Sequence, residues 1–179
     1  VGVLSGQNAH LAVSTLVVHD QSGVRAGVPF QFAYRRVLEE ATTSAEADAL
    51  MRSMTLTVTN NLMIVDREGD SRVLELHPER IVPRRSENGR LVATNHFVSK
   101  EQSIPRLSFT VYSSKKRFET VTTTCPATGG ESTVRLEDAK RALSDSAIAF
   151  TVQSMIFLPR EGALEVAFAK RSPVTKPGT

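Results

Sequence analysis

The sequence predicts an α+β fold made mostly of antiparallel strands, with its helices grouped together instead of alternating with single strands. Apolar, β-branched runs come in pairs around short polar turns, and two amphipathic helical segments follow one another directly. No internal repeat is visible. The chain has 179 residues, of which 40% are hydrophobic and 23% charged. This composition is typical of a folded domain with a core of useful size.

The first predicted element is a strand pair. The runs VGVLSG and LAVSTLVV are separated by the polar residues 7–10, a pattern that indicates two strands joined by a short turn. A loop rich in glycine follows, up to Pro29.

Two consecutive helices are predicted over residues 29–54. Pro29 is suited to a first helical turn, and Thr43 with Glu46 forms the sequence pattern of a capping box at the start of the second helix. The apolar residues of the first helix recur at spacings of three and four: Phe30, Ala33, Tyr34, Val37, Leu38 and Ala41.

Three hairpins are predicted after the helices. The first covers residues 62–76 around a glycine-containing turn, and the last covers 148–170. Between them, RIVPRR and RLVAT flank Ser86-Glu87-Asn88-Gly89, where Asn-Gly is a strong turn signal. The predicted strand 91–94 of this middle hairpin ends directly before Asn95.

Two further helices are expected in the second half of the chain. One lies within residues 113–121, with Ser113 or Ser114 as its N-cap, and the other is the run LEDAKRALSD. Residues 172–179 are expected to form a flexible tail, which leaves 1–171 as one domain.

Composition excludes several classes of function. Net charge is only +3, with scattered basic residues, so no nucleic-acid partner is expected. No apolar run approaches a membrane span. The four histidines lack metal-site spacing, and no phosphate-binding or dinucleotide motif occurs; neither a metal nor a cofactor is expected. The single cysteine permits no internal disulfide, and a cytoplasmic location is expected.

Two residues are candidates for chemistry. Asn95 could offer its amide to the negative charge that develops on a carbonyl oxygen, although a strand-end asparagine more often caps or turns the chain. Arg117 could stand beside a reacting group, although a surface ion pair is the default interpretation for such a residue. Cys125 has no local feature that would activate a thiol, and a structural role is favoured.

The order of several motifs resembles one enzyme family. GQNAHLAVS, GVPFQFAYRRVLEEATTSAEADALM, NNLMIVDREGDSRVLELHP, RLVATNHF, SSKKRF and TVQSMIFLPREGALEVAF together resemble the acyl-coenzyme A:6-aminopenicillanic acid acyltransferase family. That family is allied to the choloylglycine hydrolases, penicillin V acylases and acid ceramidases. The resemblance covers residues 1–171 and implies a four-layer αββα fold of the N-terminal nucleophile (Ntn) hydrolases. A cysteine exposed by self-cleavage attacks an amide or thioester carbonyl in these enzymes.

The resemblance also suggests roles for individual residues. Asn95 matches the family's oxyanion-hole asparagine, and Arg117 matches its arginine beside the nucleophile, with Arg106 as a competing match. Phe97 lies next to these residues and could line an apolar acyl pocket, together with Phe109, Tyr112 and Phe118. Packing in the core is the favoured alternative for these aromatic residues.

The chain also departs from the family pattern. The nucleophilic cysteine is expected in a segment upstream of Val1, and Cys125, which is internal, cannot replace it. The turn at Asn8 lacks the family's glycine, and Thr15, Leu16 and Val17 occupy the region where relatives often carry a second oxyanion asparagine. Two hypotheses follow: an amidohydrolase or acyltransferase for a small-molecule amide or thioester, or a catalytically inert acyl- or peptide-binding or structural relative. A homo-oligomer is possible in either case.

Overall fold

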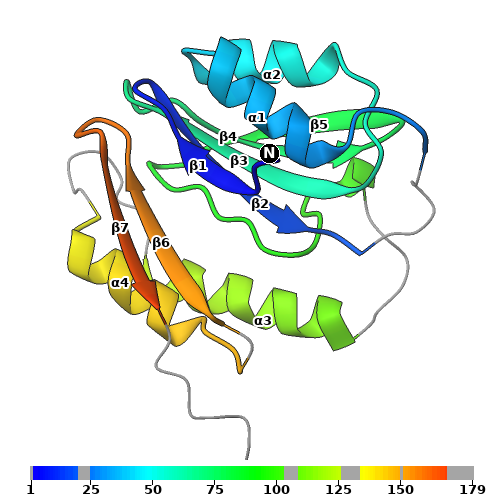
Figure 1. Cartoon of the computed structure of the whole chain (residues 1–179). Coiled ribbons are helices and arrows are strands. Elements are labelled where there is room, and N and C mark those ends of the chain that lie inside the picture. The colour runs from blue at the N-terminus through cyan, green and yellow to red at the C-terminus, as the bar shows by residue number, and fades with distance from the viewer. Residues whose placement is uncertain (1, 20–24, 103–108, 126–133, 150, 169–179) are drawn as a thin grey trace, which may run out of the picture.

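A five-stranded antiparallel sheet forms the centre of the structure (Figure 1). The computed structural model describes residues 2–19, 25–102, 109–125, 134–149 and 151–168. The strands follow sequence order across the sheet: β1 (Ser5–Gln7), β2 (Leu11–Val17), β3 (Asn60–Asp66), β4 (Ser71–His77) and β5 (Arg80–Arg85). The predicted first strand pair and the hairpin at 62–76 are confirmed as β1–β2 and β3–β4.

Helices α1 (Phe30–Glu40) and α2 (Ser44–Arg52) cover one face of this sheet (Figure 1). This confirms the helical prediction for residues 29–54. Thr43 and Glu46 form the predicted capping box, a device that typically contributes about 1 kcal/mol. The core lies between these helices and the face of the sheet that they cover. Every second residue of each strand points to this face. The core contains Leu11, Val13, Tyr34, Val37, Met51, Leu62, Ile64, Leu74 and Leu76.

Asn8 joins the β1–β2 turn to the end of α1. Its Oδ1 accepts hydrogen bonds from the backbone N–H groups of His10 and Leu11 at 2.7 and 2.8 Å, and its Nδ2 donates to the carbonyl of Leu38 at 2.8 Å. The side chain therefore forms the turn and satisfies a carbonyl left open at the helix end. Among the described residues, positive φ angles occur only at Asn88 and three other positions, all glycines. The glycine missing from this turn is thus not needed for its backbone conformation.

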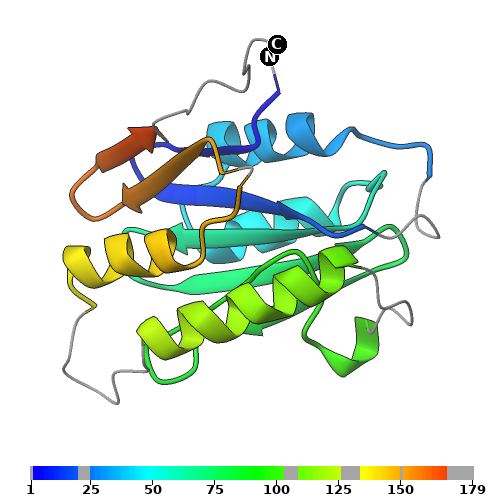
Figure 2. The same cartoon turned by 90° about the horizontal axis from the view of Figure 1, so that it is seen from below.

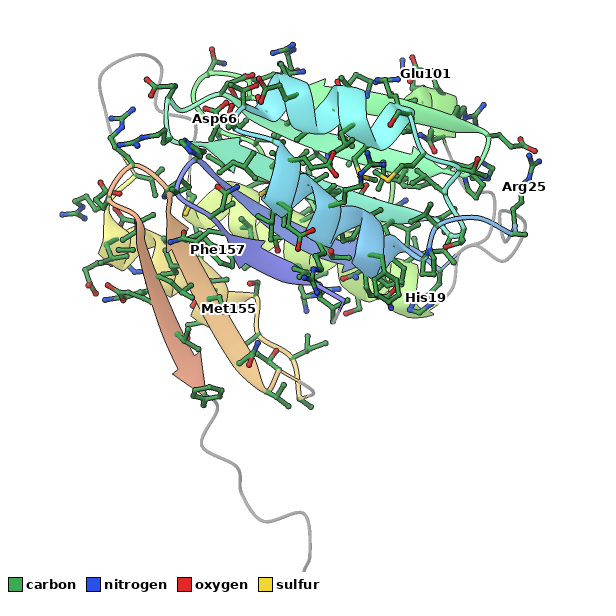
Figure 3. All side chains as sticks on the ribbon, turned by 45° about the horizontal axis from the view of Figure 1, so that its top comes forward. His19, Arg25, Asp66, Glu101, Met155 and Phe157 are labelled. Atoms are coloured by element: carbon green, nitrogen blue, oxygen red, sulfur yellow. The ribbon has the colours of Figure 1, made fainter. Side chains whose placement is uncertain are left out.

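The opposite face of the sheet is covered by the second half of the chain. Helices α3 (Phe109–Thr124) and α4 (Leu136–Asp145) lie on this side together with the hairpin of β6 (Gln153–Leu158) and β7 (Ala163–Phe168) (Figure 2). This confirms the predicted last hairpin and the helix LEDAKRALSD. A cavity of about 430 Å³ lies between β2, β3, α4 and β6. Met155 and Phe157 of β6 line it together with Met63 of β3 (Figure 3).

The predicted N-cap of the third helix is wrong. Helix α3 begins at Phe109, so Ser113 and Ser114 lie inside it. Ser114 is fully buried, and its hydroxyl donates to Oγ1 of Thr94 at 3.0 Å. The hydroxyl of Ser114 therefore bonds to a residue outside the helix instead of capping the first turn.

The strand predicted at 91–94 does not form. The Asn-Gly turn is present, with φ angles of 50° at Asn88 and 75° at Gly89, and an isolated bridge joins Glu87 to Arg90 across it. The residues that follow this bridge form no strand with β5. They cross the second face of the sheet instead. Arg84 of β5 holds them there by donating from Nη2 to the carbonyl of Val92 at 3.0 Å.

Some predictions fall outside the described residues. These are the tail 172–179 and the competing arginine, Arg106. Within the part of the chain that is described, no helix is long and apolar enough to cross a membrane.

Candidate active site

Buried polar side chains fix residues 92–99 on the second face of the sheet. Asn61 of β3 and Glu75 of β4 are register partners and both point to this face. Asn61 donates from Nδ2 to the carbonyls of Thr94 and His96, each at 2.8 Å. Side chains of the sheet, and not a backbone ladder, therefore determine where this segment lies.

Glu75 is the charged member of this group and has no exposed surface. Its Oε1 accepts from Nε of Arg84 at 2.8 Å and from the backbone N–H of Val98 at 2.7 Å. Both the hydroxyl and the backbone N–H of Ser99 also donate to this carboxylate. A buried carboxylate with a cation and several donors around it is fully compensated, and it anchors the segment just beyond Asn95.

Asn95 and Arg117 are in direct contact. Nη2 of Arg117, on α3, donates to Oδ1 of Asn95 at 3.0 Å, and Nδ2 of Asn95 donates to the carbonyl of Val17 at 2.8 Å. Val17 is the last residue of β2. The expected proximity of the two side chains is confirmed, and it brings together a strand end, a loop and a helix that are distant in sequence.

The contact with Arg117 determines the orientation of the amide. Because a guanidinium only donates hydrogen bonds, the atom that faces it must be the amide oxygen. One N–H of Asn95 is used by Val17, and the other has no partner among the described residues. Arg117 itself is half-buried, which lowers the pKa of its guanidinium, and its Nε lacks a partner within the described part of the chain. One N–H of Asn95 is thus left for a further group, whereas the unpartnered Nε of Arg117 is buried.

A second network lies directly beside Asn95. Nδ1 of His96 is 2.8 Å from Oγ of Ser114 and 3.1 Å from Oγ1 of Thr94. The ring of His96 meets that of Phe118 edge-on, with centroids 5.6 Å apart. Burial, assisted by the nearby cations of Lys115, Arg84 and Arg117, lowers the pKa of His96. The lowered pKa favours the neutral form of this half-buried imidazole.

The remaining candidates lie in different surroundings. Phe97 is only 9% exposed, as expected for a packed side chain. Cys125 follows the end of α3, where burial and the carboxylate of Asp138 raise the pKa of its thiol. A raised pKa disfavours the reactive thiolate. No group of three or more potential metal ligands occurs among the described residues.

Comparison with known proteins identifies the family. The sequence profile described as "Acyl-coenzyme A:6-aminopenicillanic acid acyl-transferase" matches residues 1–173, which is nearly the whole chain. The chain belongs to this acyl-transferase family. The predicted membership in an enzyme family is therefore confirmed. None of the curated protein sequences compared with the chain matches it.

Solved structures show which fold this acyl-transferase-family chain adopts. A mutant conjugated bile acid hydrolase from Clostridium perfringens superimposes with a TM-score of 0.66 at 14% identity, covering 96% of this chain and 70% of that protein. An N-acylethanolamine-hydrolyzing acid amidase ortholog from Caenorhabditis elegans gives 0.63 at 18%, covering 89% and 70%. Penicillin V acylase from Agrobacterium tumefaciens gives 0.59 at 19%, covering 85% and 54%. The predicted α+β Ntn-hydrolase fold is thereby confirmed.

Sequence reasoning missed the residues that support the site. Asn61 and Glu75 lie in strands that otherwise read as apolar, NNLMIVD and SRVLELH. A charged residue in the middle of a strand with a buried, apolar pattern is an unusual feature. That anomaly was a usable signal, whereas Ser114 gave none, because a serine within a polar run is unremarkable.

Proposed function

We propose that this acyl-transferase-family chain carries the oxyanion-stabilising part of an Ntn-type amidohydrolase or acyltransferase. Its substrate would be a small-molecule amide or thioester. Asn95 donates an N–H to the carbonyl oxygen as negative charge develops on it, and Arg117 lies beside the reacting group. The contact between Asn95 and Arg117, with Nη2 to Oδ1 at 3.0 Å, is the observation that carries the proposal.

The proposed reaction needs a thiol that Cys125 does not supply. An Ntn nucleophile is an N-terminal cysteine whose own α-amino group acts as its base. Cys125 is internal, and burial raises the pKa of its thiol. We propose that the nucleophile precedes Val1 in the full-length protein. Its thiol attacks the carbonyl and expels the amine or thiol of the substrate, which leaves with the proton that the α-amino group took from the nucleophile. The acyl group on the sulfur then passes to water or to an amine.

The geometry supports a donor role for Asn95 in two ways. Its oxygen and one N–H are already engaged by Arg117 and by the carbonyl of Val17, so the amide cannot rotate freely. A donor that is oriented before the reaction needs no reorganisation as charge develops. Its flanking backbone is held by the buried side chain of Asn61.

An inert relative is the second candidate. It is favoured by the region where relatives often carry a second oxyanion asparagine, because Thr15, Leu16 and Val17 there supply no amide side chain. Only one side-chain amide would then face the carbonyl. An acyl- or peptide-binding protein would use the same N–H groups to hold a carbonyl without reaction.

Substitution of Asn95 in the full-length protein separates the two candidates. Asn95→Ala should lower turnover of an acyl-amide substrate by about 10²- to 10³-fold, the usual effect of losing one oxyanion donor. Stability should change by no more than about 0.5 kcal/mol, because the side chain is partly exposed. Asn88→Gly is a suitable control, since it replaces an asparagine of positive φ in a nearby turn. Unchanged turnover in Asn95→Ala, or a full-length protein that binds but never turns over acyl amides, would contradict the enzymatic proposal.

A further inference from the structure

Asn61 makes an unusual pair of contacts around the candidate site. Its Nδ2 donates to the carbonyl of Thr94 and to the carbonyl of His96, both at 2.8 Å. These carbonyls belong to the residues immediately before and after Asn95. One side chain therefore holds the backbone on both sides of the proposed oxyanion donor.

The burial of Asn61 is costly unless these contacts matter. The residue has no exposed surface, and its Oδ1 has no hydrogen-bond partner among the described residues. A buried amide oxygen without a partner destabilises the folded state. Met63 and Val65 of the same strand face the same side of the sheet, so an apolar residue would fit the pattern at position 61. An apolar residue at this position would lack the N–H groups that Asn61 donates to the carbonyls of Thr94 and His96.

Backbone pairing contributes little to the position of Asn95. Around it, the backbone pairing described is the single bridge between Thr94 and His96. Asn61 is the register partner of Leu16 in β2, so its neighbour across the sheet directly precedes Val17. Strands β2 and β3 thus position both Asn61, which holds the backbone around Asn95, and the carbonyl of Val17, which accepts a hydrogen bond from the Asn95 amide.

We propose that Asn61 is a positioning residue, which fixes the backbone of 94–96 so that the amide of Asn95 points at the reacting carbonyl. The catalytic consequence rests on the function proposed above, but the positioning itself does not. A displacement of about 1 Å in a reacting group can lower a rate by roughly 10²-fold. Loss of the Asn61 side chain should therefore lower turnover without removing any group that contacts substrate.

The neighbouring residue offers a matched control. Asn60 is also a buried asparagine of β3 with an unpartnered Oδ1. It points to the opposite face, where its Nδ2 donates to the hydroxyl of Tyr34 at 3.2 Å. Asn60→Ala thus removes the same buried group from the same strand without touching residues 94–96. Asn61→Ala and the isosteric Asn61→Asp, which lacks the N–H donors, are the test variants.

The test combines a structural and a kinetic measurement on the full-length protein. The side-chain amide signals of Asn95, assigned by their loss in Asn95→Ala, are followed by ¹⁵N–¹H NMR in each variant. They should shift or broaden in Asn61→Ala and stay in place in Asn60→Ala. Turnover of an acyl amide should fall roughly ten- to a hundredfold in Asn61→Ala, with KM within about twofold of the wild-type value.

A double variant shows whether Asn61 acts through Asn95. In an Asn95→Ala background, Asn61→Ala should lower turnover no further, because the group that it positions is absent. The inference would be overturned by Asn95 signals that are unchanged in Asn61→Ala, or that shift equally in Asn60→Ala. It would also be overturned if Asn61→Ala lowered turnover in the Asn95→Ala background as much as it does in the wild type. Should Asn95→Ala alone leave turnover intact, the proposed function fails, while the NMR signals still decide whether Asn61 positions the amide.

Discussion

Glu75 and Arg84 form an ion pair on the second face of the sheet, with Nε of Arg84 2.8 Å from Oε1 of Glu75. The side chain of Glu75 is fully buried and that of Arg84 is 17% exposed. The same carboxylate accepts the backbone N–H of Val98 and the same guanidinium donates to the carbonyl of Val92. The pair therefore holds the segment at two points, one on each side of Asn95.

We expect Glu75→Ala to reduce the free energy of unfolding by about 3–5 kcal/mol, because it leaves Arg84 without its buried counter-ion. Urea unfolding measures this change. Glu79→Ala is the control, since Glu79 is an exposed glutamate paired with Arg25, and exposed pairs contribute about 0–1 kcal/mol. Equal effects of the two substitutions would show that the buried pair does not anchor the segment.

Arg117→Ala should lower turnover in the full-length protein by at least tenfold, because the amide of Asn95 would lose the donor that sets its orientation. Arg117→Lys should recover only part of this loss, since a lysine lacks the planar fork of the guanidinium. Steady-state kinetics with an acyl amide measure both variants. Lys116→Ala, at the exposed neighbouring position, should behave like the wild type. A fully active Arg117→Ala would assign Arg117 to the structure alone.

The lowered pKa of His96 predicts a dependence of stability on pH. The unfolded chain takes up a proton as the pH falls through about 6.5, the ordinary value, while the folded protein still holds the imidazole neutral. Stability is therefore complete above pH 6.5 and is lost as the pH falls below it, by up to about 1.4 kcal/mol per pH unit. Thermal unfolding between pH 5 and 8 should show a weaker slope in His96→Gln. The exposed His19 provides His19→Gln as a control; an identical slope in both variants would contradict this assignment.

Phe97→Ala should reduce the free energy of unfolding by about 3–5 kcal/mol, the usual cost of removing a buried aromatic ring. Its substrate-binding role stays a prediction that a series of acyl amides can test. If Phe97 lines the acyl pocket, Phe97→Leu should raise KM more for long acyl chains than for short ones. An unchanged KM across the series would leave Phe97 as a packing residue.

The sequence was sufficient for the elements whose patterns are local. The spacing of apolar residues and the capping box at Thr43 determine the two helices on the first face, and the turn signals determine the hairpins. The order of the motifs also placed Asn95 and Arg117 together, which the structure confirms. These features depend on residues close in sequence or on a family pattern.

The strand predicted at 91–94 failed for a reason that is not local. Its composition suits a strand, but the polar groups of Asn61, Glu75 and Arg84 draw it across the sheet. The same three residues support the candidate site and were not identified beforehand. Contacts of this kind span 8 to 35 positions, so no pattern within the segment itself reveals them.

The turn between β3 and β4 has a consequence for the geometry of the site. Gly69, with a φ of 95°, closes this turn, and the pairing that follows places Asn61 opposite Glu75. Side chains alternate between faces along a strand, so an insertion or deletion of one residue there would turn one of the two toward α1 and α2. The length of a surface loop remote in sequence from Asn95 thus contributes to the geometry around Asn95. A substitution at Gly69 would strain this turn because of its positive φ, and a single-residue insertion or deletion would change the register of the two strands.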